Sequence, residues 1–262
     1  AGFRYVKSDN EYRTKLNDNV YETDDSIAQY CEFHYGEENF GVKNFCVNSV
    51  ELLKPYLEKN KTNKALDLGC SVGRSTFELA KTFDEVTGID FSANFINVGV
   101  KLMKYDSLTF RVKQEGDISS EKTVSLKDFG LEQTQEKVSF MQGDACNLKD
   151  IYTGYDLIFC SNLIDRLYYP QKFIDDIPSR VNDDGLLVLL SPYTWLEEYT
   201  PKENWLGGYI KDNKEVSTLE TLKTELQDFE LQETIDVPFV IKETNRKYQH
   251  SVSQMSIWKK KA

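Results

Sequence analysis

Five short apolar runs alternate with helical segments between residues 63 and 194, and this order restricts the fold more than any other feature. Apolar runs of about 4–8 residues are typical of strands buried on both faces of a parallel sheet. The pattern predicts an α/β fold with a doubly wound sheet, in which a ligand binds at the carboxyl ends of the strands. The runs are residues 64–69, 85–90, 137–144, 155–162 and 185–192, and the helical segments are 74–83, 91–105 and 170–181.

The remaining segments are expected to flank this core as parts of one domain, residues 1–262. In the N-terminal part, Asp24 or Asp25 is the expected N-cap of a first helix that stops at Gly36. A surface hairpin is expected at residues 108–131. The predicted parts are an N-terminal helical cap (1–62, with helices at 24–35 and 47–60), the core (63–194), and a closing part (195–262) with an aromatic loop, a helix at 217–229 and two final strands.

Composition restricts the partners that this chain can have. A formal net charge of −11 disfavours a nucleic-acid polyanion. No run approaches the ~18 apolar residues of a membrane-spanning helix, so no membrane contact is expected. The five cysteines form no C-x-x-C pair and there are only two histidines, so we expect no metal site and free thiols in a reducing cytoplasm.

The turn after the first apolar run distinguishes between classes of ligand. "ALDLGCSVGRS" ends its strand at Asp67 and then turns from Gly69 to Gly73. The dinucleotide motif G-x-G-x-x-G would need glycine at Ser71, and a nucleoside-triphosphate loop would need lysine at Arg74. An acid beside the turn repels a phosphate, but it attracts the sulfonium and ammonium groups of S-adenosylmethionine.

Polar residues at the next strand ends extend the same site. Asp90 comes 23 residues after Asp67, where a carboxylate can accept hydrogen bonds from both ribose hydroxyls. Asp144 is placed for the adenine amino group, and Asn162 lies under the methionine part. Asp67 could equally cap the following helix, and Gly73 could simply pack that helix on the sheet. The predicted cofactor is therefore S-adenosylmethionine, held by Asp67, Gly69, Cys70, Ser71, Gly73, Arg74, Asp90, Phe91, Ser92, Asp144, Ala145 and Asn162.

This arrangement resembles the class I S-adenosylmethionine-dependent methyltransferases, over roughly residues 63–194 and the closing strands. The resemblance implies a methyltransferase with a Rossmann-like sheet and an antiparallel C-terminal strand. From Tyr21 onward, the chain more specifically resembles the methyltransferase domain of ovothiol synthase, a family that methylates the π-nitrogen of 5-thiohistidine. The segments that carry this likeness are "EFHYGEENFGVKNF", "DLGCSVGRSTFELA", "GDACNL", "SNLIDRLYYP", "SPYTWLEEYTPKENWLGG" and "VPFVIKETNRKYQHSVSQ".

The resemblance also implies a partner. The long form of that enzyme carries an iron-dependent sulfoxide synthase ahead of the methyltransferase domain, and nothing in this sequence supplies its histidine ligands. We therefore expect the sulfoxide synthase on a separate chain or on a fused part. Residues 1–20 align with nothing in the family.

A small, planar, zwitterionic acceptor needs aromatic walls and a few fixed charges. The first helices, the loop after the fifth apolar run and the last hairpin offer such side chains. Arg246, Arg166 and Arg74 compete for the acceptor's carboxylate. Phe45 and His250 also fit simple packing roles. The predicted acceptor residues are Tyr35, Asn44, Phe45, Tyr193, Trp195, Arg246 and His250.

Methyl transfer from a sulfonium is an in-line displacement, and an imidazole nitrogen attacks only when it carries a lone pair. Asp165, just after the fourth run, is the candidate to orient or accept the ring proton, although a tyrosine or water could serve. Asp165 and Arg166 also fit a simple salt bridge. The adjacent thiolate is a softer nucleophile, so orientation must give selectivity. The alternatives are a methyltransferase for another small amine, phenol or thiol, and a non-enzymatic cofactor-binding module.

Overall fold

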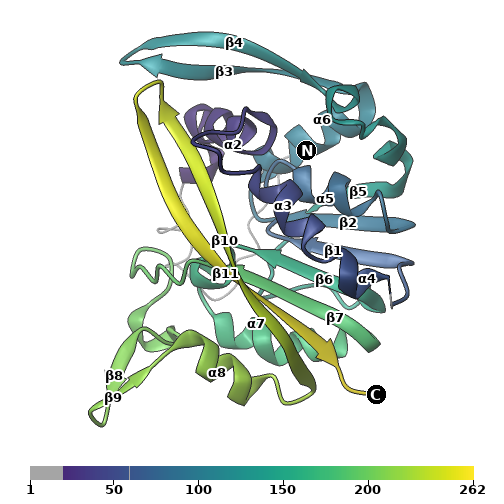
Figure 1. Ribbon diagram of the computed structural model, residues 1–262, viewed down its shortest axis with the longest axis vertical. Helices are drawn as coiled ribbons and strands as arrows, with labels where there is room; N and C mark the ends of the chain where they lie inside the picture. The colour runs from purple at the N-terminus through teal and green to yellow at the C-terminus, as the bar shows by residue number, and fades with distance from the viewer. Residues whose placement is uncertain (1–19, 59) are drawn as a thin grey trace.

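The computed structural model describes residues 20–58 and 60–262, and its centre is a mixed sheet of seven strands (Figure 1). From one edge to the other, the strands are β10 (Phe229–Thr244), β11 (Lys247–Lys260), β7 (Val181–Ser191), β6 (Tyr155–Ser161), β1 (Lys64–Leu68), β2 (Glu85–Asp90) and β5 (Val138–Gln142). Neighbouring strands from β7 to β5 run parallel, whereas β11 is antiparallel to both of its neighbours. The predicted α/β sheet with an antiparallel C-terminal strand is confirmed.

Side chains that alternate along the central strands enter two separate cores. On β6, Leu157 and Phe159 belong to one core, whereas Ile158 and Cys160 belong to the other. Helices cover both faces, which makes the sheet doubly wound (Figure 1). The first face carries α2 (Asp24–Tyr35), α3 (Phe45–Glu51), α5 (Arg74–Leu79) and α6 (Ala93–Tyr105), and the second carries α7 (Pro170–Asp176) and α8 (Thr218–Glu225).

The N-terminal helices differ in detail from the sequence pattern. Helix α2 stops before Gly36 as expected, but its N-cap is Thr23, whose Oγ1 accepts a hydrogen bond from the Ser26 amide at 3.2 Å. The segment 47–60 was expected as one helix, yet α3 ends at Glu51 and a short helix α4 (Lys54–Leu57) follows. Pro55 explains the break, because it has no amide proton to continue the helical hydrogen bonds. The part of the predicted cap before residue 20 lies outside the described residues.

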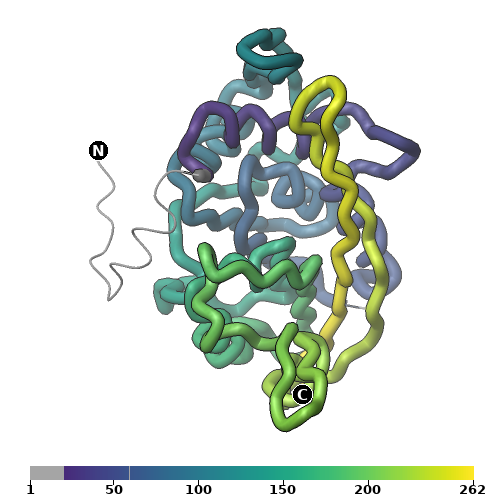
Figure 2. Tube along the Cα trace, turned by 90° about the vertical axis from the view of Figure 1, so that its left-hand side faces the viewer, coloured from purple at the N-terminus to yellow at the C-terminus, as the bar shows by residue number. Residues whose placement is uncertain are grey.

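Two hairpins reach beyond the central sheet. β3 (Ser107–Glu115) pairs with β4 (Ile118–Ser125), which confirms the hairpin predicted at 108–131. β10 and β11 form a long ribbon, but β7 pairs only with residues 254–259 of β11, so the turn of the ribbon projects away from the sheet. Figure 2 shows this ribbon running along the length of the molecule. A small hairpin of β8 (Tyr209–Lys211) and β9 (Lys214–Val216) lies in the aromatic loop.

The described residues contain no helix that is long and apolar enough to cross a membrane. They also contain no group of three or more His, Cys, Asp or Glu side chains that could hold a metal ion. All five cysteines are free thiols, and four of them are buried.

Candidate functional site

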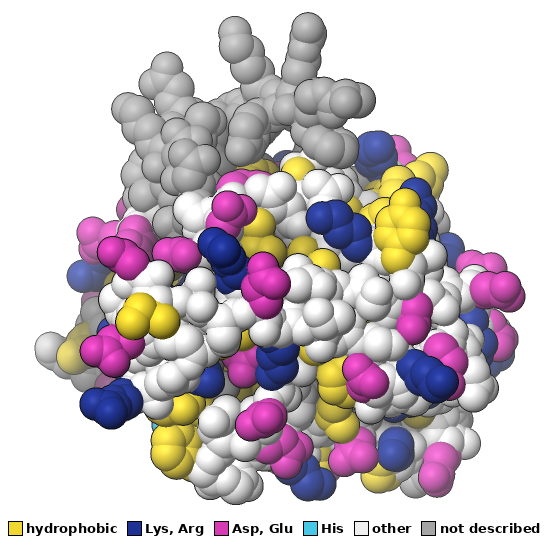
Figure 3. Space-filling view, turned by 90° about the horizontal axis from the view of Figure 1, so that it is seen from above, with side chains coloured by type: hydrophobic (Ala, Val, Ile, Leu, Met, Phe, Trp, Pro, Cys, Tyr) yellow, Lys and Arg dark blue, Asp and Glu magenta, His cyan; other side chains and the backbone are white. Residues whose placement is uncertain are grey.

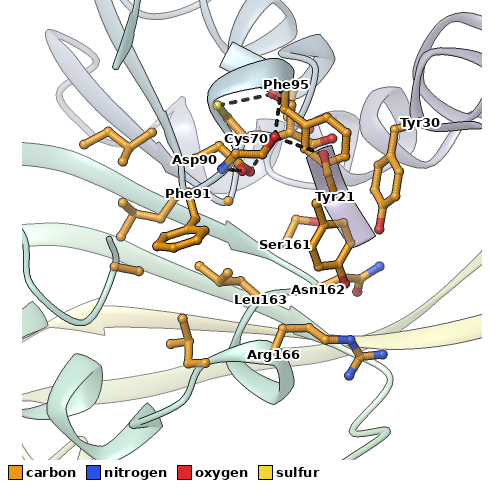
Figure 4. A pocket seen from close by; sticks show the side chains of 18 of the residues that line it. Tyr21, Tyr30, Cys70, Asp90, Phe91, Phe95, Ser161, Asn162, Leu163 and Arg166 are labelled. Atoms are coloured by element: carbon orange, nitrogen blue, oxygen red, sulfur yellow. Dashed lines mark hydrogen bonds between the residues drawn. The ribbon is translucent and has the colours of Figure 1, made fainter. Parts of the chain in front are cut away.

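A cleft opens at the carboxyl ends of the parallel strands, and η1 (Val20–Glu22, a 3₁₀ helix) and α2 contribute to its walls (Figure 4). This is where a doubly wound sheet binds its ligands. Nine of the predicted cofactor residues line it: Gly69, Cys70, Ser71, Asp90, Phe91, Ser92, Asp144, Ala145 and Asn162. The other three, Asp67, Gly73 and Arg74, do not.

The glycine turn between β1 and α5 presents its backbone to the cleft. Gly69 (φ 73°), Ser71 (φ 49°) and Gly73 (φ 90°) all lie in the left-handed region. The Gly69 amide donates to the Ile89 carbonyl at 2.8 Å, which ties the turn to the end of β2. A Cβ on Gly73 would lie 2.7 Å from the Phe140 ring, so this glycine is required for packing α5 against the sheet.

Asp90, at the end of β2, holds the centre of the site together. Its Oδ2 accepts a hydrogen bond from the Ser71 amide, and its Oδ1 accepts one from the Ser92 amide, both at 2.8 Å. Burial raises the pKa of Asp90 to about 6; the two amides oppose the rise and the nearby Glu22 carboxylate adds to it. Each carboxylate oxygen has further lone-pair capacity, so the group can still accept hydrogen bonds from two ligand hydroxyls.

Asp67 and Arg74 lie behind the turn. The Asp67 side chain is buried, and its Oδ2 accepts a hydrogen bond from Thr76 Oγ1 at 2.7 Å. Burial raises the pKa of Asp67 to about 7. Arg74 Nε donates to Glu78 Oε1 at 2.8 Å, and its guanidinium lies 4.2 Å from the centre of the Phe129 ring. Both side chains therefore fix α5 beneath the turn, without lining the cleft.

Apolar and acidic groups from three strand ends form one part of the cleft. Phe91 follows β2 and Leu163 follows β6 (Figure 4). Ala145 follows β5. Asp144 lies in the same region, where its Oδ1 accepts a hydrogen bond from the Cys146 amide at 2.9 Å. A flat base fits between such apolar walls, with a carboxylate at its polar edge.

Aromatic side chains from η1, α2 and α3 line the other part of the cleft, which we call the aromatic compartment. The Tyr30 ring centre lies 4.9 Å from that of Phe95, and Tyr21 contacts Phe95 at 5.9 Å. Phe33 stacks on Phe45 at 5.9 Å. Of these residues, sequence reasoning had named Phe45 alone. The helical spacing of Tyr30 and Phe33 on α2 was the signal that could have found them.

Arg166 is the arginine that lines the cleft, among the three that competed for an acceptor carboxylate. Its Nη1 donates to Asp165 Oδ2 at 2.7 Å and to the Thr194 carbonyl at 2.9 Å, and its guanidinium stacks 4.8 Å from the Tyr199 ring centre. Figure 4 shows its side chain beneath Asn162 and Tyr21. The guanidinium is thus fixed at the wall of the aromatic compartment.

Asp165, the predicted proton acceptor, does not line the cleft. It is fully buried, and besides Arg166 it accepts hydrogen bonds from Ser191 Oγ at 3.0 Å, the Thr194 amide at 3.1 Å and Thr194 Oγ1 at 3.0 Å. With both oxygens engaged, the carboxylate positions Arg166 and the start of the loop after β7. This differs from the proton-accepting role expected from the sequence and agrees with the alternative, a salt bridge with Arg166.

Phe45 alone among the seven predicted acceptor residues lines the cleft. The buried Tyr35 donates its hydroxyl to the Val72 carbonyl at 3.0 Å, which joins α2 to the glycine turn. The Asn44 side chain caps α3 by accepting a hydrogen bond from the Val47 amide at 3.2 Å. Both residues therefore support the walls of the cleft from outside.

The start of the loop after β7 packs into the core on the face of α7 and α8, whereas Tyr199 farther along packs against Arg166 and Tyr21 at the edge of the cleft. Trp195 is buried in that core, stacks on Trp205, and donates its Nε1 hydrogen to Thr218 Oγ1 at 2.9 Å. Tyr193 donates its hydroxyl to Gln254 Oε1 at 3.2 Å. These partners explain why neither residue lines the cleft, contrary to the expectation for this loop.

Arg246 and His250 are exposed on the β10–β11 ribbon. The turn of the ribbon projects beyond the part of β11 that pairs with β7, and neither side chain lines the cleft. Ile241 lines the cleft from this ribbon.

Replacing Trp195 with phenylalanine is expected to lower the free energy of unfolding by about 2 kcal/mol, because the smaller ring loses packing and the hydrogen bond to Thr218. Ligand affinity in the cleft should be unchanged. Denaturant unfolding and ligand titration of the same sample check both parts. A normal stability with weakened ligand binding would mean that Trp195 does reach the ligand.

Comparison with known proteins gives a family match over most of the chain. A family model described as a methyltransferase domain matches residues 42–233. That range contains the parallel strands, the glycine turn and the whole loop after β7.

Solved structures share the fold at low sequence identity. The N-methyltransferase NodS from Bradyrhizobium japonicum WM9, in complex with S-adenosyl-L-homocysteine, is 14% identical with a TM-score of 0.56, over 96% of this chain and 99% of that chain. An S-adenosylmethionine-dependent methyltransferase from Clostridium acetobutylicum ATCC 824 is 13% identical with a TM-score of 0.52, over 89% and 96%. The [4+2]-cyclase SpnF is 12% identical with a TM-score of 0.54, over 92% and 97%. These similarities show the fold, and the cyclase among them shows that this fold supports more than one reaction.

Proposed function

The chain belongs to the family of methyltransferase domains, and on this premise we propose that it methylates the π-nitrogen of 5-thiohistidine. It is an S-adenosylmethionine-dependent methyltransferase, as the family match over residues 42–233 and the Rossmann-like fold indicate. The acceptor is the proposed part. The ring nitrogen would attack the methyl carbon as the carbon–sulfur bond breaks. The electron pair of that bond would stay on the sulfur of the cofactor, and the ring would release its proton to water.

The cofactor half of the proposal is supported by the strand-end polar groups. Asp90 is held by two amides and faces the cleft, where it can accept hydrogen bonds from the two ribose hydroxyls. Asp144 and the apolar wall of Phe91 and Ala145 suit the adenine. Asn162, just after β6, lines the cleft where the methionine part of S-adenosylmethionine would lie. S-adenosylmethionine, when bound, supplies the electrophilic methyl group.

The single observation that supports an amino-acid acceptor is the fixed guanidinium of Arg166 in the aromatic compartment. An arginine fork binds a carboxylate in a defined plane. Tyr30 and Phe33 offer flat apolar surface for a small ring. Together with the sequence resemblance from Tyr21 onward, these groups favour 5-thiohistidine over a simple amine, phenol or thiol that lacks a carboxylate.

The source of the acceptor and the cellular setting are part of the same proposal. An iron-dependent sulfoxide synthase, on a separate or fused chain, would supply the thiohistidine. Five free thiols favour the cytoplasm. On the face shown in Figure 3, basic side chains are interspersed with acidic ones, an arrangement that does not favour a nucleic-acid partner.

Cofactor affinity is expected to fall about tenfold between pH 7 and pH 5. The pKa of Asp90 is raised to about 6, and ribose hydroxyls donate more strongly to its ionised form than to its protonated form, so each pH unit below 6 makes binding less favourable. Calorimetric titration of S-adenosylmethionine across this pH range measures the slope of log Kd against pH. Asp90→Asn should remove the slope, whereas Asp67→Asn, outside the cleft, should retain it. An unchanged slope in Asp90→Asn would assign the titration to another group.

Binding of the acceptor tests the proposed substrate without requiring turnover. Protein loaded with S-adenosylhomocysteine should bind 5-thiohistidine more tightly than histidine, cysteine or 5-mercaptoimidazole, which lacks the carboxylate. Calorimetry on the four compounds gives the ranking. Equal affinity for 5-thiohistidine and 5-mercaptoimidazole would contradict the role of the carboxylate.

A further inference from the structure

His34, near the end of α2, is a buried histidine whose ring lines the cleft. Its Nδ1 accepts a hydrogen bond from the Arg74 amide at 3.4 Å. That amide belongs to the first turn of α5, where backbone amides have no partner within the helix. The imidazole therefore satisfies the start of the helix that follows the glycine turn.

This contact fixes the tautomer of the ring. An amide hydrogen can be accepted only by an unprotonated ring nitrogen, so the ring proton lies on Nε2. Burial, together with the positive charge of Arg74, lowers the pKa of His34 to about 3, which keeps the imidazole neutral throughout the physiological range. His34 thus offers the cleft one N–H donor and does not exchange a proton.

The Nε2 hydrogen has no protein acceptor among residues 20–58 and 60–262. The ring is surrounded by aromatic groups that cannot accept it strongly: the ring centres of Phe33 and Tyr30 lie 5.5 and 6.3 Å away. Among the described residues, Nε2 does not belong to the fully buried polar atoms without a partner, so it is accessible from the cleft. Its position at the cleft points to an acceptor atom on a bound ligand.

We propose that His34 sets the selectivity for the methyl acceptor: its Nε2–H donates to an anionic atom of the acceptor and holds that atom away from the transferred methyl group. This assignment rests on the proposed function, under which the atom is the thiolate sulfur of 5-thiohistidine. A thiolate that accepts a hydrogen bond is also a weaker nucleophile. The ring nitrogen is then the atom that faces the cofactor.

Arg166 and His34 offer an anionic acceptor two hydrogen-bond donors at the wall of the cleft. Arg166 acts on the Tyr30 phenol electrostatically, and Tyr30 also lies beside His34, so both donors border the same aromatic compartment. Arg166 would hold the carboxylate, and His34 would hold the sulfur. Two fixed points determine how the ring between them is turned.

Nitrogen NMR on the free and cofactor-loaded protein tests the state of His34 independently of any acceptor. The chain has only two histidines, and His250 is exposed, so a His250→Gln variant assigns the signals. We expect His34 to remain neutral with its proton on Nε2 from pH 5.5 to 8. A proton on Nδ1, or titration within that range, overturns the inference whatever the acceptor is.

Product analysis then tests selectivity. His34→Phe keeps a ring but removes the donor, and should raise the KM for 5-thiohistidine about tenfold, the effect of one hydrogen bond to a charged atom. Some S-methylated product should appear, and the Kd for S-adenosylmethionine should stay within about twofold of the wild-type value. His34→Gln, which restores an N–H near the Nε2 position, should recover nitrogen selectivity.

The outcomes separate the two proposals. A His34→Phe enzyme with the wild-type KM and only ring-nitrogen product overturns the role of His34 and leaves the proposed function intact. A wild-type enzyme that does not methylate 5-thiohistidine overturns the proposed function and, with it, the assignment of sulfur to His34. The tautomer measurement still decides whether His34 is a fixed donor.

Discussion

Replacing Asp90 with alanine is expected to weaken the binding of S-adenosylmethionine by about 2–4 kcal/mol, the value of two charge-assisted hydrogen bonds. The carboxylate faces the cleft at the end of β2 and has capacity for two hydroxyl donors beyond the Ser71 and Ser92 amides. Titration calorimetry measures the loss. An unchanged affinity would contradict the assignment of this strand end to the ribose.

Because Asp90 also ties the glycine turn to α6, its loss could act through the backbone. Asp90→Asn keeps an acceptor for one amide and is the matched variant. Competition with adenosine and with 2′,3′-dideoxyadenosine separates the two effects, because the second compound has no ribose hydroxyls at these positions. Asp90→Asn should weaken the binding of adenosine and leave the binding of dideoxyadenosine unchanged. Equal weakening of both would mean that Asp90 acts only through the turn.

Replacing Arg166 with alanine is expected to lower kcat/KM for the acceptor by about 30- to 1,000-fold, with little effect on cofactor affinity. The physical reason is the loss of a fixed guanidinium that forms two charge-assisted hydrogen bonds to a carboxylate, worth about 2–4 kcal/mol. Steady-state kinetics with each substrate varied in turn gives the separation. An equal loss in cofactor affinity would place Arg166 in the cofactor half of the cleft.

Arg166→Ala also leaves the buried Asp165 without its cation, so the melting temperature must be measured with it. Arg166→Lys keeps a charge beside Asp165 but loses the planar fork, and should recover stability more than activity. Asp165→Asn should raise the KM for the acceptor through a misplaced Arg166. A full recovery of activity in Arg166→Lys would mean that only the charge matters.

The parts of the site that lie close together in the sequence could be predicted from it. Asp90 ends an apolar strand and the N-cap Ser92 comes two residues later, so strand end, acid and helix start are one local signal. Gly69 and Gly73 are likewise read from a single turn. Such features depend on local conformation, and the alternation of strands and helices then brings them to one edge of the sheet.

The parts that depend on distant partners could not be predicted. The salt bridge between Asp165 and Arg166 could be read from their adjacency, but the burial of Asp165 depends on Ser191 and Thr194, which are distant in the sequence. Arg246 was placed at the acceptor because the last hairpin was expected to offer charged side chains there, but the turn of this hairpin projects away from the sheet. Contacts between residues that are far apart in the chain leave no local pattern in the sequence.

The acceptor walls were missed for a related reason. In the sequence, Trp195 in its aromatic loop stands out more than the aromatic residues of α2. Its indole N–H nevertheless donates to Thr218, and its ring packs in the core on the face of α7 and α8. Tyr30, Phe33 and His34 lie on one face of α2, which reads as an ordinary packing face in the sequence. Only the docking of α2 beside the strand ends turns that face into a wall of the cleft.

The most direct test of the account is methyl transfer from methyl-labelled S-adenosylmethionine to 5-thiohistidine, with histidine and cysteine assayed in parallel, and NMR of the product. We predict labelled methyl on the π-nitrogen of 5-thiohistidine, formed much faster than any product from the other two compounds. Absence of transfer to 5-thiohistidine, or transfer mainly to its sulfur, would contradict the proposed acceptor and the orientation that the cleft is inferred to impose.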